Sequence, residues 1–351
     1  MKQRPSPPSS SVTLRDVALA AGVSQATASR VLNGSTRRVI EAYRARVLAA
    51  ADRLGYTANL SAQATARGMS SVIALLVADI ADPYFGQIAS GVASGADEVG
   101  LVVTIAVTER DSARETALVR TLRGMRPAGL ILAASRDSEP VPALQHELDA
   151  YTATGGTVVM IGPGTEGFRS VPLDNYGGAR ALGQMLADRG YRSAVVFGAL
   201  AGVRSSDDRI AGFKDGFTAS GGAVGRVYRQ GYTRLSGYSL MRQALADGLR
   251  PGTLVFGVSD MVAVGALAAL REGGRQVGDD IALAGYDDTA TGRDVTPALT
   301  TVSIPLEEVG YQALRAAVDP DWTPQSAHIG FEVVMRDSTP AQSTTREGGT
   351  T

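Results

Sequence analysis

Cysteine is absent from all 351 residues of the chain, which excludes disulfides, thiolate metal sites and cysteine nucleophiles. Histidine is nearly absent too: His146 and His328 are the only two, and neither has a neighbour at metal-ligand spacing. Paired catalytic residues and a phosphate-binding loop are also missing from the sequence. We therefore predict that the protein is not an enzyme and that it holds neither a metal nor a cofactor.

Long hydrophobic runs are missing as well. No segment reaches the roughly 18 consecutive apolar residues of a membrane span, and residues 1–8 lack the apolar core of a signal peptide. Aromatic residues make up only 5% of the chain against 44% hydrophobic residues, so the core should be aliphatic. The composition predicts a cytoplasmic globular protein with no membrane contact, and the length fits two or three domains.

Lysine is scarce, and arginine carries almost all of the positive charge, which is unevenly distributed. Residues 1–68 hold ten basic and three acidic side chains, a net charge of +7, while the remainder carries −8. A basic head on an acidic body is typical of a phosphate-binding module joined to a domain that does not bind nucleic acid.

The basic segment contains two short helical patterns separated by a tight turn. Apolar residues recur at helical spacing from Leu14 to Ala21, and Gly22 suits the left-handed conformation at a helix end. Ser24 can cap a second helix. This spacing predicts a helix-turn-helix whose second helix enters a DNA major groove, with an ordinary helical hairpin as the alternative. A third helix is expected from about residue 40 to residue 54.

Residues Thr13 to Asn33 also contain Asp-Val-Ala, Ala-Gly-Val-Ser and Ser-Arg-Val-Leu-Asn, and here the chain resembles the N-terminal signature of the LacI/GalR family of bacterial transcription regulators. Gln25 and Ala26 would then read bases at the start of the recognition helix, and Arg30 would reach guanine. The other DNA-binding candidates are short polar residues suited to phosphates or helix caps: Thr13, Ser24, Thr27, Ser29 and Asn33. For Thr27 and Ser29, capping or packing is an equal alternative.

In that family the next segment is a hinge helix that folds on the operator and inserts a leucine into the minor groove. Here the hinge corresponds to residues 58–70, and the family's Ala-Arg-x-Leu aligns with Ala-Gln-Ala-Thr. Gln63 therefore replaces the arginine and Thr65 the leucine. Leu60 or Met69 would take the wedge position only in a different register. Two alternatives follow, a hinge helix that kinks DNA or a flexible tether.

From Ser71 onward, apolar strand patterns alternate with helical ones, and the rhythm restarts after about residue 174. It predicts two α/β halves with parallel sheets, helices on both sheet faces and a cleft between the halves. The resemblance implies a two-lobed core like that of periplasmic binding proteins, with the lobe boundary near 170 and further crossings near 300 and 325. The predicted organisation is a disordered tail (1–11), an all-α helix-turn-helix head (12–57), a hinge (58–70), the effector-binding and dimerisation core (71–337) and a second disordered tail (338–351).

Small ligands bind at the carboxyl ends of parallel strands, so we expect an effector pocket between the lobes. Four motifs resemble those that line the family's pocket: Asp-Pro-Tyr-Phe (82–85), Arg-Ile-Ala-Gly-Phe (209–213), Ser-Asp (259–260) and Gly-Tyr-Asp-Asp (285–288). They give the candidate effector-binding residues Tyr84, Phe85, Arg209, Ser259, Asp260 and Asp287. The arginine can fork onto hydroxyls or a carboxylate, and the resemblance makes Asp287 the acceptor of ligand hydroxyls.

Some positions depart from the family pattern or have a plainer interpretation. Ser259 stands where the family has asparagine, and Asp207 where some members carry a ligand-binding arginine. Core packing is the alternative for Tyr84 and Phe85, and an N-cap is the alternative for Asp207. The segment Gly162–Gly167 satisfies G-x-G-x-x-G, but no helical pattern follows it, so we interpret it as a loop.

Together these features predict a ligand-responsive transcriptional regulator that binds double-stranded operator DNA. The resemblance implies a homodimer, or a tetramer, on a pseudo-palindromic site, and a repressor that a small sugar-like effector releases. Corepression is the alternative mode. A solute-binding protein of a transporter would share the core, but it would carry a signal peptide and would not need the basic head.

Overall fold

The computed structural model describes residues 12–32, 39–57, 70–133, 141–327 and 329–342. The chain divides into two compact units, Met1–Ser70 and Ser71–Thr351, which we call the head and the core. Four predicted site residues, Asn33, Leu60, Gln63 and Thr65, lie outside the described residues. Within the described residues, no helix is both long and apolar enough to cross a membrane.

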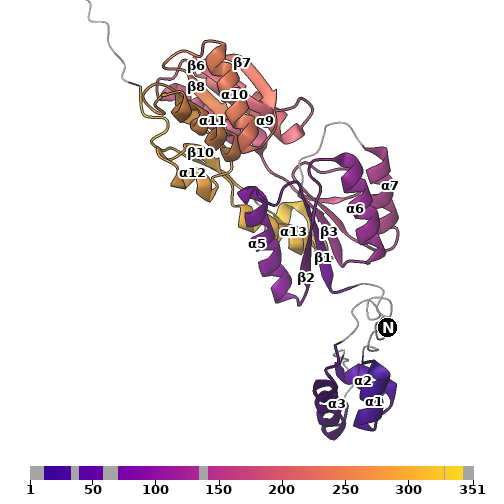
Figure 1. Cartoon of the computed structure of the whole chain (residues 1–351). Helices are drawn as coiled ribbons and strands as arrows, with labels where there is room; N and C mark the ends of the chain where they lie inside the picture. Colours follow the sequence, from indigo (N-terminus) through magenta and orange to yellow (C-terminus); the bar gives the residue numbers. More distant parts are fainter. Residues whose placement is uncertain (1–11, 33–38, 58–69, 134–140, 328, 343–351) are drawn as a thin grey trace, which may run out of the picture. The chain divides into compact units, whose positions relative to one another are not determined.

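The head is a unit of helices: α1 (Leu14–Ala21), α2 (Gln25–Leu32) and α3 (Glu41–Leu54) (Figure 1). Thr13 and Asp16 form a reciprocal capping box at the start of α1, and Gly22 ends that helix in the left-handed conformation with φ of 63°. The small core of the head is aliphatic: Val17, Ala18, Ala21, Ala28, Val31, Val47, Ala50 and Ala51. The predicted helix-turn-helix is confirmed.

The first lobe of the core is built on a parallel sheet in the order β2-β1-β3-β4-β5. Its strands are β1 (Val72–Val77), β2 (Val102–Val107), β3 (Gly129–Leu132), β4 (Val158–Ile161) and β5 (Arg169–Val171). Its helices are α5 (Pro83–Glu98), α6 (Ser112–Gly124), α7 (Pro142–Thr152) and α13 (Leu306–Val318). Although α13 comes late in the sequence, it lies among these early elements, where Figure 1 draws it in yellow beside purple strands.

The crossing of α13 over α5 is close because glycine stands at the contact. A Cβ at Gly310 would lie only 2.0 Å from the carbonyl oxygen of Ile88, and one at Gly91 only 1.8 Å from that of Glu307. Any larger side chain would push the two helices apart. The late helix is therefore an integral layer of the first lobe.

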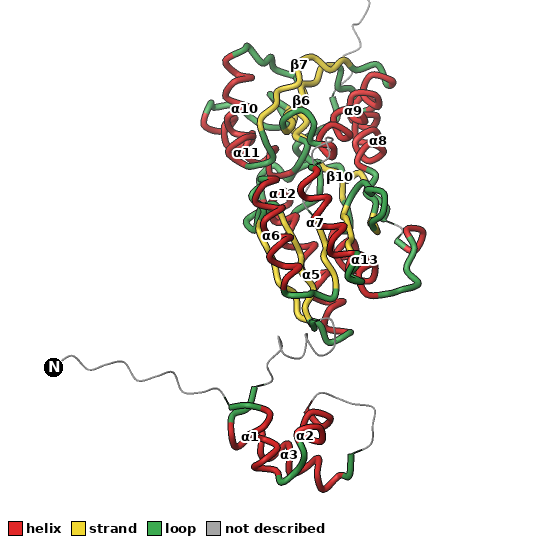
Figure 2. The backbone as a smooth tube through the Cα atoms, turned by 90° about the vertical axis from the view of Figure 1, so that its right-hand side faces the viewer, coloured by secondary structure: helices red, strands yellow, loops and turns green. Residues whose placement is uncertain are grey.

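The second lobe repeats the architecture with a parallel sheet in the order β7-β6-β8-β9. Its strands are β6 (Ser193–Ala199), β7 (Ala223–Gln230), β8 (Leu254–Gly257) and β9 (Ala282–Ala284). Its helices are α8 (Asn175–Asp188), α9 (Arg204–Ala219), α10 (Arg234–Ala246), α11 (Asp260–Glu272) and the short α12 (Ala290–Asp294). Figure 2 shows α8 and α9 on one side of β6 and β7, with α10 and α11 on the other.

The lobes are joined by segments that cross between them. The antiparallel pair β10 (Thr301–Ser303) and β11 (Glu332–Val334) flanks the excursion of the chain into α13 and the 3-10 turn η1 (Pro324–Ser326). The predicted fold class, a helical head followed by a two-lobed core with parallel sheets, is confirmed.

Two strands were missed and one capping alternative was wrong. The residues after the Gly162–Gly167 loop form β5, which is fixed by hydrogen bonds from the Arg169 guanidinium to the carbonyl groups of Ala316 and Asp319. Strand β7 was missed because it is an edge strand in which buried and exposed residues do not alternate regularly. Helix α9 begins at Arg204, so Asp207 does not cap it. Its carboxylate instead accepts a hydrogen bond from the Gly202 amide at 2.8 Å.

The prediction of a disordered tail from residue 338 is wrong for residues 338–342, which belong to the core. Ser338 is fully buried, its hydroxyl donates to the carbonyl oxygen of Leu283 at 2.6 Å, and its Oγ accepts the Thr300 amide at 2.8 Å. A segment rich in serine and threonine suggests disorder by composition, but here the hydroxyls satisfy buried backbone groups.

Candidate DNA interface and effector pocket

The start of α2 is fixed by two of the predicted DNA-binding hydroxyls. Ser24 Oγ accepts the Thr27 amide at 3.1 Å and lies 2.8 Å from Thr27 Oγ1, so the two side chains form one N-cap. Thr13 plays the same part for α1. Ser29 is half-buried. Helix capping is therefore the observed role of Thr13, Ser24 and Thr27, and the cap sets the direction in which α2 begins.

The exposed face of α2 carries the predicted base-reading residues. Gln25, Ala26 and Arg30 are exposed, whereas Ala28 and Val31 of the same helix are buried against the rest of the head. A helix whose buried stripe anchors it and whose opposite face presents an amide, a methyl group and a guanidinium can place these groups in a major groove.

The core contains a pocket of about 700 Å³ between its lobes, at the carboxyl ends of strands from both sheets. Five of the six predicted effector residues line it: Tyr84, Phe85, Arg209, Ser259 and Asp287. The sixth, Asp260, does not. The sequence motifs that follow separate strands are thus brought to one cavity.

The Arg209 side chain is held in the pocket by contacts to four other residues. Its Nε donates to Asn175 Oδ1 at 2.8 Å, Nη1 donates to the carbonyl oxygen of Val258 at 2.7 Å, and Nη2 lies 2.9 Å from Asp287 Oδ1. The guanidinium carbon also lies 3.8 Å from the centroid of the Tyr286 ring. These contacts fix the guanidinium in one orientation, so it meets a ligand without losing further side-chain freedom.

Helix α9, which carries Arg209, is positioned by a close crossing with α8. A Cβ at Gly212 would lie 2.1 Å from the carbonyl oxygen of Tyr176, and one at Gly216 would lie 2.0 Å from that of Arg180. Only glycine permits this backbone-to-backbone contact. The crossing therefore sets the distance between Arg209 on α9 and its partner Asn175 at the start of α8.

Asp287 lies on a strained turn directly after β9. It has φ of 106° and Asp288 has φ of 55°, backbone angles that residues other than glycine rarely adopt. The Asp287 amide donates to the Val302 carbonyl oxygen at 2.8 Å, which holds the turn in place. Burial raises the pKa of Asp287 to about 8, against the opposing effect of the Arg209 charge. The ion pair with Arg209 uses Oδ1, which leaves Oδ2 to accept a hydrogen bond from a ligand hydroxyl.

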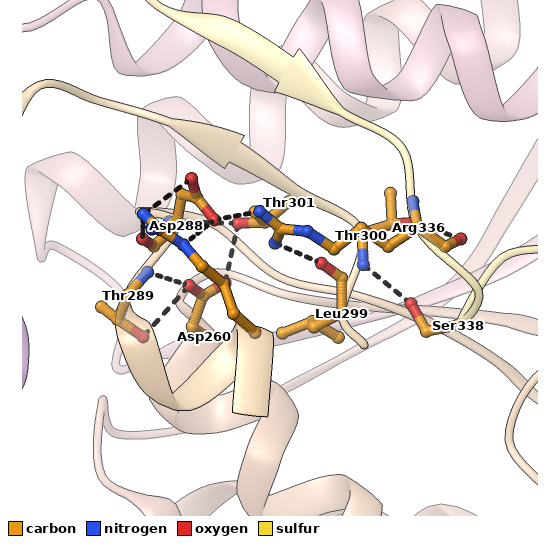
Figure 3. Close-up of polar contacts among 9 residues, drawn as sticks. Asp260, Asp288, Thr289, Leu299, Thr300, Thr301, Arg336 and Ser338 are labelled. Carbon is orange, nitrogen blue, oxygen red and sulfur yellow. Dashed lines mark hydrogen bonds and ion pairs between the residues drawn. The ribbon is translucent and has the colours of Figure 1, made fainter. Parts of the chain in front are cut away.

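Asp260 supports the pocket from behind. Figure 3 shows its carboxylate between Thr289 and Thr301: Oδ2 accepts the Thr289 amide at 2.7 Å and Oδ1 accepts the Thr301 hydroxyl at 2.7 Å. The same view shows Arg336 reaching Asp288 at 2.6 Å. Asp260 thus acts by tying the strained turn to the neighbouring strand, and the prediction of a direct effector contact does not fit its position.

The aromatic part of the pocket comes from both lobes. Tyr84 and Phe85 pack edge to face with ring centroids 5.0 Å apart, and Asp82 Oδ1 accepts the Tyr84 amide at 3.0 Å to cap α5. From the second lobe, Tyr232 lines the same cavity, and its hydroxyl oxygen lies 2.7 Å from Ser205 Oγ. Burial raises the pKa of Asp82 and of both tyrosines.

Most of the other pocket-lining residues were not predicted, among them Arg110, Asn175 and Tyr232. Tyr232 follows β7, so the rule that ligands bind at strand ends would have found it if that strand had been predicted. Asn175 was interpreted only as the start of a helix. Arg110 follows the predicted strand β2, but no local pattern separates it from the charged residues beside it.

Comparison with known proteins decides which family has this combination of head and pocket. Residues 13–59 match the model of the bacterial regulatory proteins of the lacI family, and residues 184–339 match that of a periplasmic binding protein-like domain. The regulator CelR of Thermobifida fusca is 31% identical over 314 residues, covering 88% of this chain and 91% of CelR. The chain belongs to the LacI family of bacterial regulatory proteins.

Other members of the LacI family agree along nearly the whole chain. The repressor PurR of Pectobacterium atrosepticum is 32% identical, covering 88% of this chain and 89% of PurR. A lac repressor dimer bound to operator and an anti-inducer superposes with a TM-score of 0.78 at 27% identity, covering 94% of this chain and 100% of that one. A complex of CelR with cellobiose superposes with a TM-score of 0.64 at 28% identity, covering 93% and 99%. The protein is therefore a DNA-binding transcriptional regulator, and a transporter component is not favoured.

Proposed function

We propose that this LacI-family regulator is a repressor that reads a pseudo-palindromic operator through α2, with Gln25, Ala26 and Arg30 as its base-reading residues. Their exposure on the face opposite the buried stripe of α2 supports this assignment. The lac repressor, which superposes on this chain, is bound to its operator as a dimer. Thr13, Ser24 and Thr27 serve first as caps, and the hydroxyls of such caps can also contact phosphates.

We further propose that a small sugar-like effector occupies the pocket of the core. The observation that carries this proposal is the pairing of Arg209 with Asp287 beside the aromatic rings of Tyr84, Phe85 and Tyr232. Carboxylates accept hydrogen bonds from ligand hydroxyls, a fixed guanidinium donates them, and aromatic rings cover the apolar faces of a sugar ring. The binding of cellobiose by the related CelR is in keeping with this ligand class.

The proposed assembly is a homodimer formed through the core. Strand β2 lies at the edge of the first sheet and exposes 59% of Val102 and 40% of Ile105. Val99, just before the strand, is also exposed. Exposed aliphatic residues on a sheet edge are typical of an interface rather than of a free surface. A Val102→Asp variant should sediment as a monomer and lose most operator affinity, whereas a wild type that sediments as a monomer at micromolar concentration would contradict the proposal.

Capture of genomic DNA fragments by the purified protein, followed by footprinting, tests the DNA-binding proposal. We expect a two-fold symmetric protected site, and affinity that falls with salt at a slope of roughly −0.9 per neutralised phosphate. Arg30→Ala should lose the footprint, while the matched variant Arg53→Ala, on the exposed side of α3, should keep it. An unchanged footprint with Arg30→Ala would remove that residue from the base-reading set.

Titration calorimetry of the full chain tests the effector proposal, with cellobiose as the first probe and other mono- and disaccharides after it. Binding of a sugar should release the footprinted DNA. Asp287→Ala should lose sugar binding but keep the footprint, whereas Asp319→Ala, which removes a partly exposed carboxylate on the first lobe, should change neither. A sugar that binds Asp287→Ala as tightly as it binds the wild type would exclude this carboxylate from the site.

A further inference from the structure

Arg110 lies where the two lobes face each other. It follows β2 in the first lobe, and its guanidinium carbon is 5.0 Å from the ring centroid of Tyr232 in the second lobe. The same carbon lies 6.0 Å from the ring centroid of Phe85 in its own lobe. Both distances fall within the range of cation–π attraction, so one cation bridges aromatic rings from both sides of the pocket.

The backbone that presents Arg110 is strained. Glu109 and Arg110 are consecutive residues with φ of 56° and 60°, in the left-handed region that most side chains avoid. Such strain persists only where the surrounding structure enforces it, and it is concentrated at functional sites. The turn directs the side chain into the pocket instead of along the surface of the first lobe.

The interaction with the rings is also the principal contact of this side chain. Within the described residues, the Arg110 guanidinium forms no ion pair and no hydrogen bond, although the neighbouring Arg114 has both. Tyr232, in contrast, is anchored in the second lobe, because it is buried and its hydroxyl lies 2.7 Å from Ser205 Oγ. The bridge therefore connects a side chain of one lobe to a fixed ring of the other.

We propose that Arg110 is a latch that holds the lobes together in the effector-free protein by resting on the Tyr232 ring. This inference concerns regulation of the same pocket and rests on the proposed function. The guanidinium occupies the ring face that a sugar would cover, so an effector stacking on that face displaces the latch. Release of Arg110 then loosens the lobes at the moment of binding, which couples the pocket to the geometry of the core.

The latch can be tested without effector or DNA, so its failure would be distinct from failure of the proposed function. The chain has no cysteine, and Ala117→Cys with Leu235→Cys places one spin label on an exposed helical position of each lobe. Pulsed dipolar spectroscopy on the labelled full chain, diluted with excess unlabelled chain, then reports the separation of the lobes within one protomer.

Arg110→Asn removes the cation and adds little backbone strain, because asparagine tolerates the left-handed region. The expected result is a rise of about two- to fivefold in the ratio of molecules with a long distance between the labels to molecules with a short one. This is the change in population that the loss of an exposed cation–π contact produces. Tyr232→Leu should give the same shift, and the double variant should give no more. Tyr232→Phe, which keeps the ring, should match the wild type.

The matched control is Arg126→Asn, because Arg126 is also exposed and left-handed, with φ of 50°, but does not line the pocket. It should leave the distances unchanged. The proposal is overturned if Arg110→Asn gives the wild-type distances, if its effect adds to that of Tyr232→Leu, or if Arg126→Asn shifts the distances equally.

Discussion

Replacement of Arg209 by methionine should strongly destabilise the core, because it leaves a buried carboxylate without its cation. The arginine and Asp287 expose only about 5% of their side chains. Arg209→Met removes the ion pair at 2.9 Å and the hydrogen bonds to Asn175 Oδ1 and the Val258 carbonyl oxygen. Breaking a buried pair from one side costs about 3–5 kcal/mol, so we expect a loss of up to that order in the free energy of unfolding at pH 9, where the wild-type carboxyl is charged.

Protonation of Asp287 limits this loss at low pH. Burial already raises the pKa of Asp287 to about 8 with the arginine present, and its removal raises that pKa further. Below the folded-state pKa the carboxyl is neutral and no unpaired charge is buried. The destabilisation by Arg209→Met should therefore be smaller at pH 6 than at pH 9.

Urea denaturation followed by tryptophan fluorescence measures this loss directly. Trp322 is the only tryptophan of the chain and is buried in the core, so its emission reports unfolding of that unit. The matched control is Arg242→Met, which breaks an exposed pair with Glu272 at 3.6 Å and should cost less than about 1 kcal/mol. The double variant Arg209→Met/Asp287→Asn, which has no unpaired charge and keeps a side chain that tolerates positive φ, should recover much of the stability. Equal losses for Arg209→Met and Arg242→Met would refute the reasoning.

Three further outcomes are expected. Asp287 binds a proton in the folded state at pH values where the unfolded chain releases it, so its contribution to stability is present below about pH 4 and is lost as the pH rises towards about 8. Asp287→Asn should therefore flatten the fall in the free energy of unfolding between these pH values, as measured by urea denaturation. An unchanged dependence on pH would contradict this. Gly212→Ala should lower the melting temperature, because its Cβ would lie 2.1 Å from the Tyr176 carbonyl oxygen. A clash of about 1–3 kcal/mol outweighs the helix-propensity gain of about 1 kcal/mol. A higher melting temperature would show that α8 and α9 can move apart to accept the methyl group. Ser338→Ala should lower the free energy of unfolding by about 1–3 kcal/mol, because the buried Thr300 amide loses its acceptor. Calorimetry that shows no loss would mean that residues 338–342 are not part of the folded core.

The sequence predicted the elements whose signals are local. Helix caps such as Thr13 and Ser24, the glycine that ends α1, and the continuous apolar runs of central strands all act within a few residues, and each led to the correct element. Strands β5 and β7 were missed because they are edge strands with charged or polar residues in a short or irregular pattern, unlike the edge strand β2, which is an apolar run. Their existence depends on long-range pairing, which no local window contains.

The pocket shows the same division between local and long-range information. Motif resemblance brought Arg209 and Asp287 to one site, and the ion pair between them agrees with that placement. It could not separate Ser259, which lines the pocket, from Asp260, which turns to Thr289 and Thr301 behind it. Adjacent residues can face opposite sides of a turn. That choice is made by tertiary hydrogen bonds and not by the dipeptide itself.

The course of the chain through the core has a consequence for the order in which a ribosome can complete it. Helix α13 is a layer of the first lobe, although it is made after the entire second sheet, and Arg336 reaches back to Asp288 beside the pocket. The head has its own small core and can fold early in synthesis. Neither lobe is complete until the last residues of the core leave the ribosome. For most of the translation time, therefore, the chain can carry a folded head but no complete effector pocket.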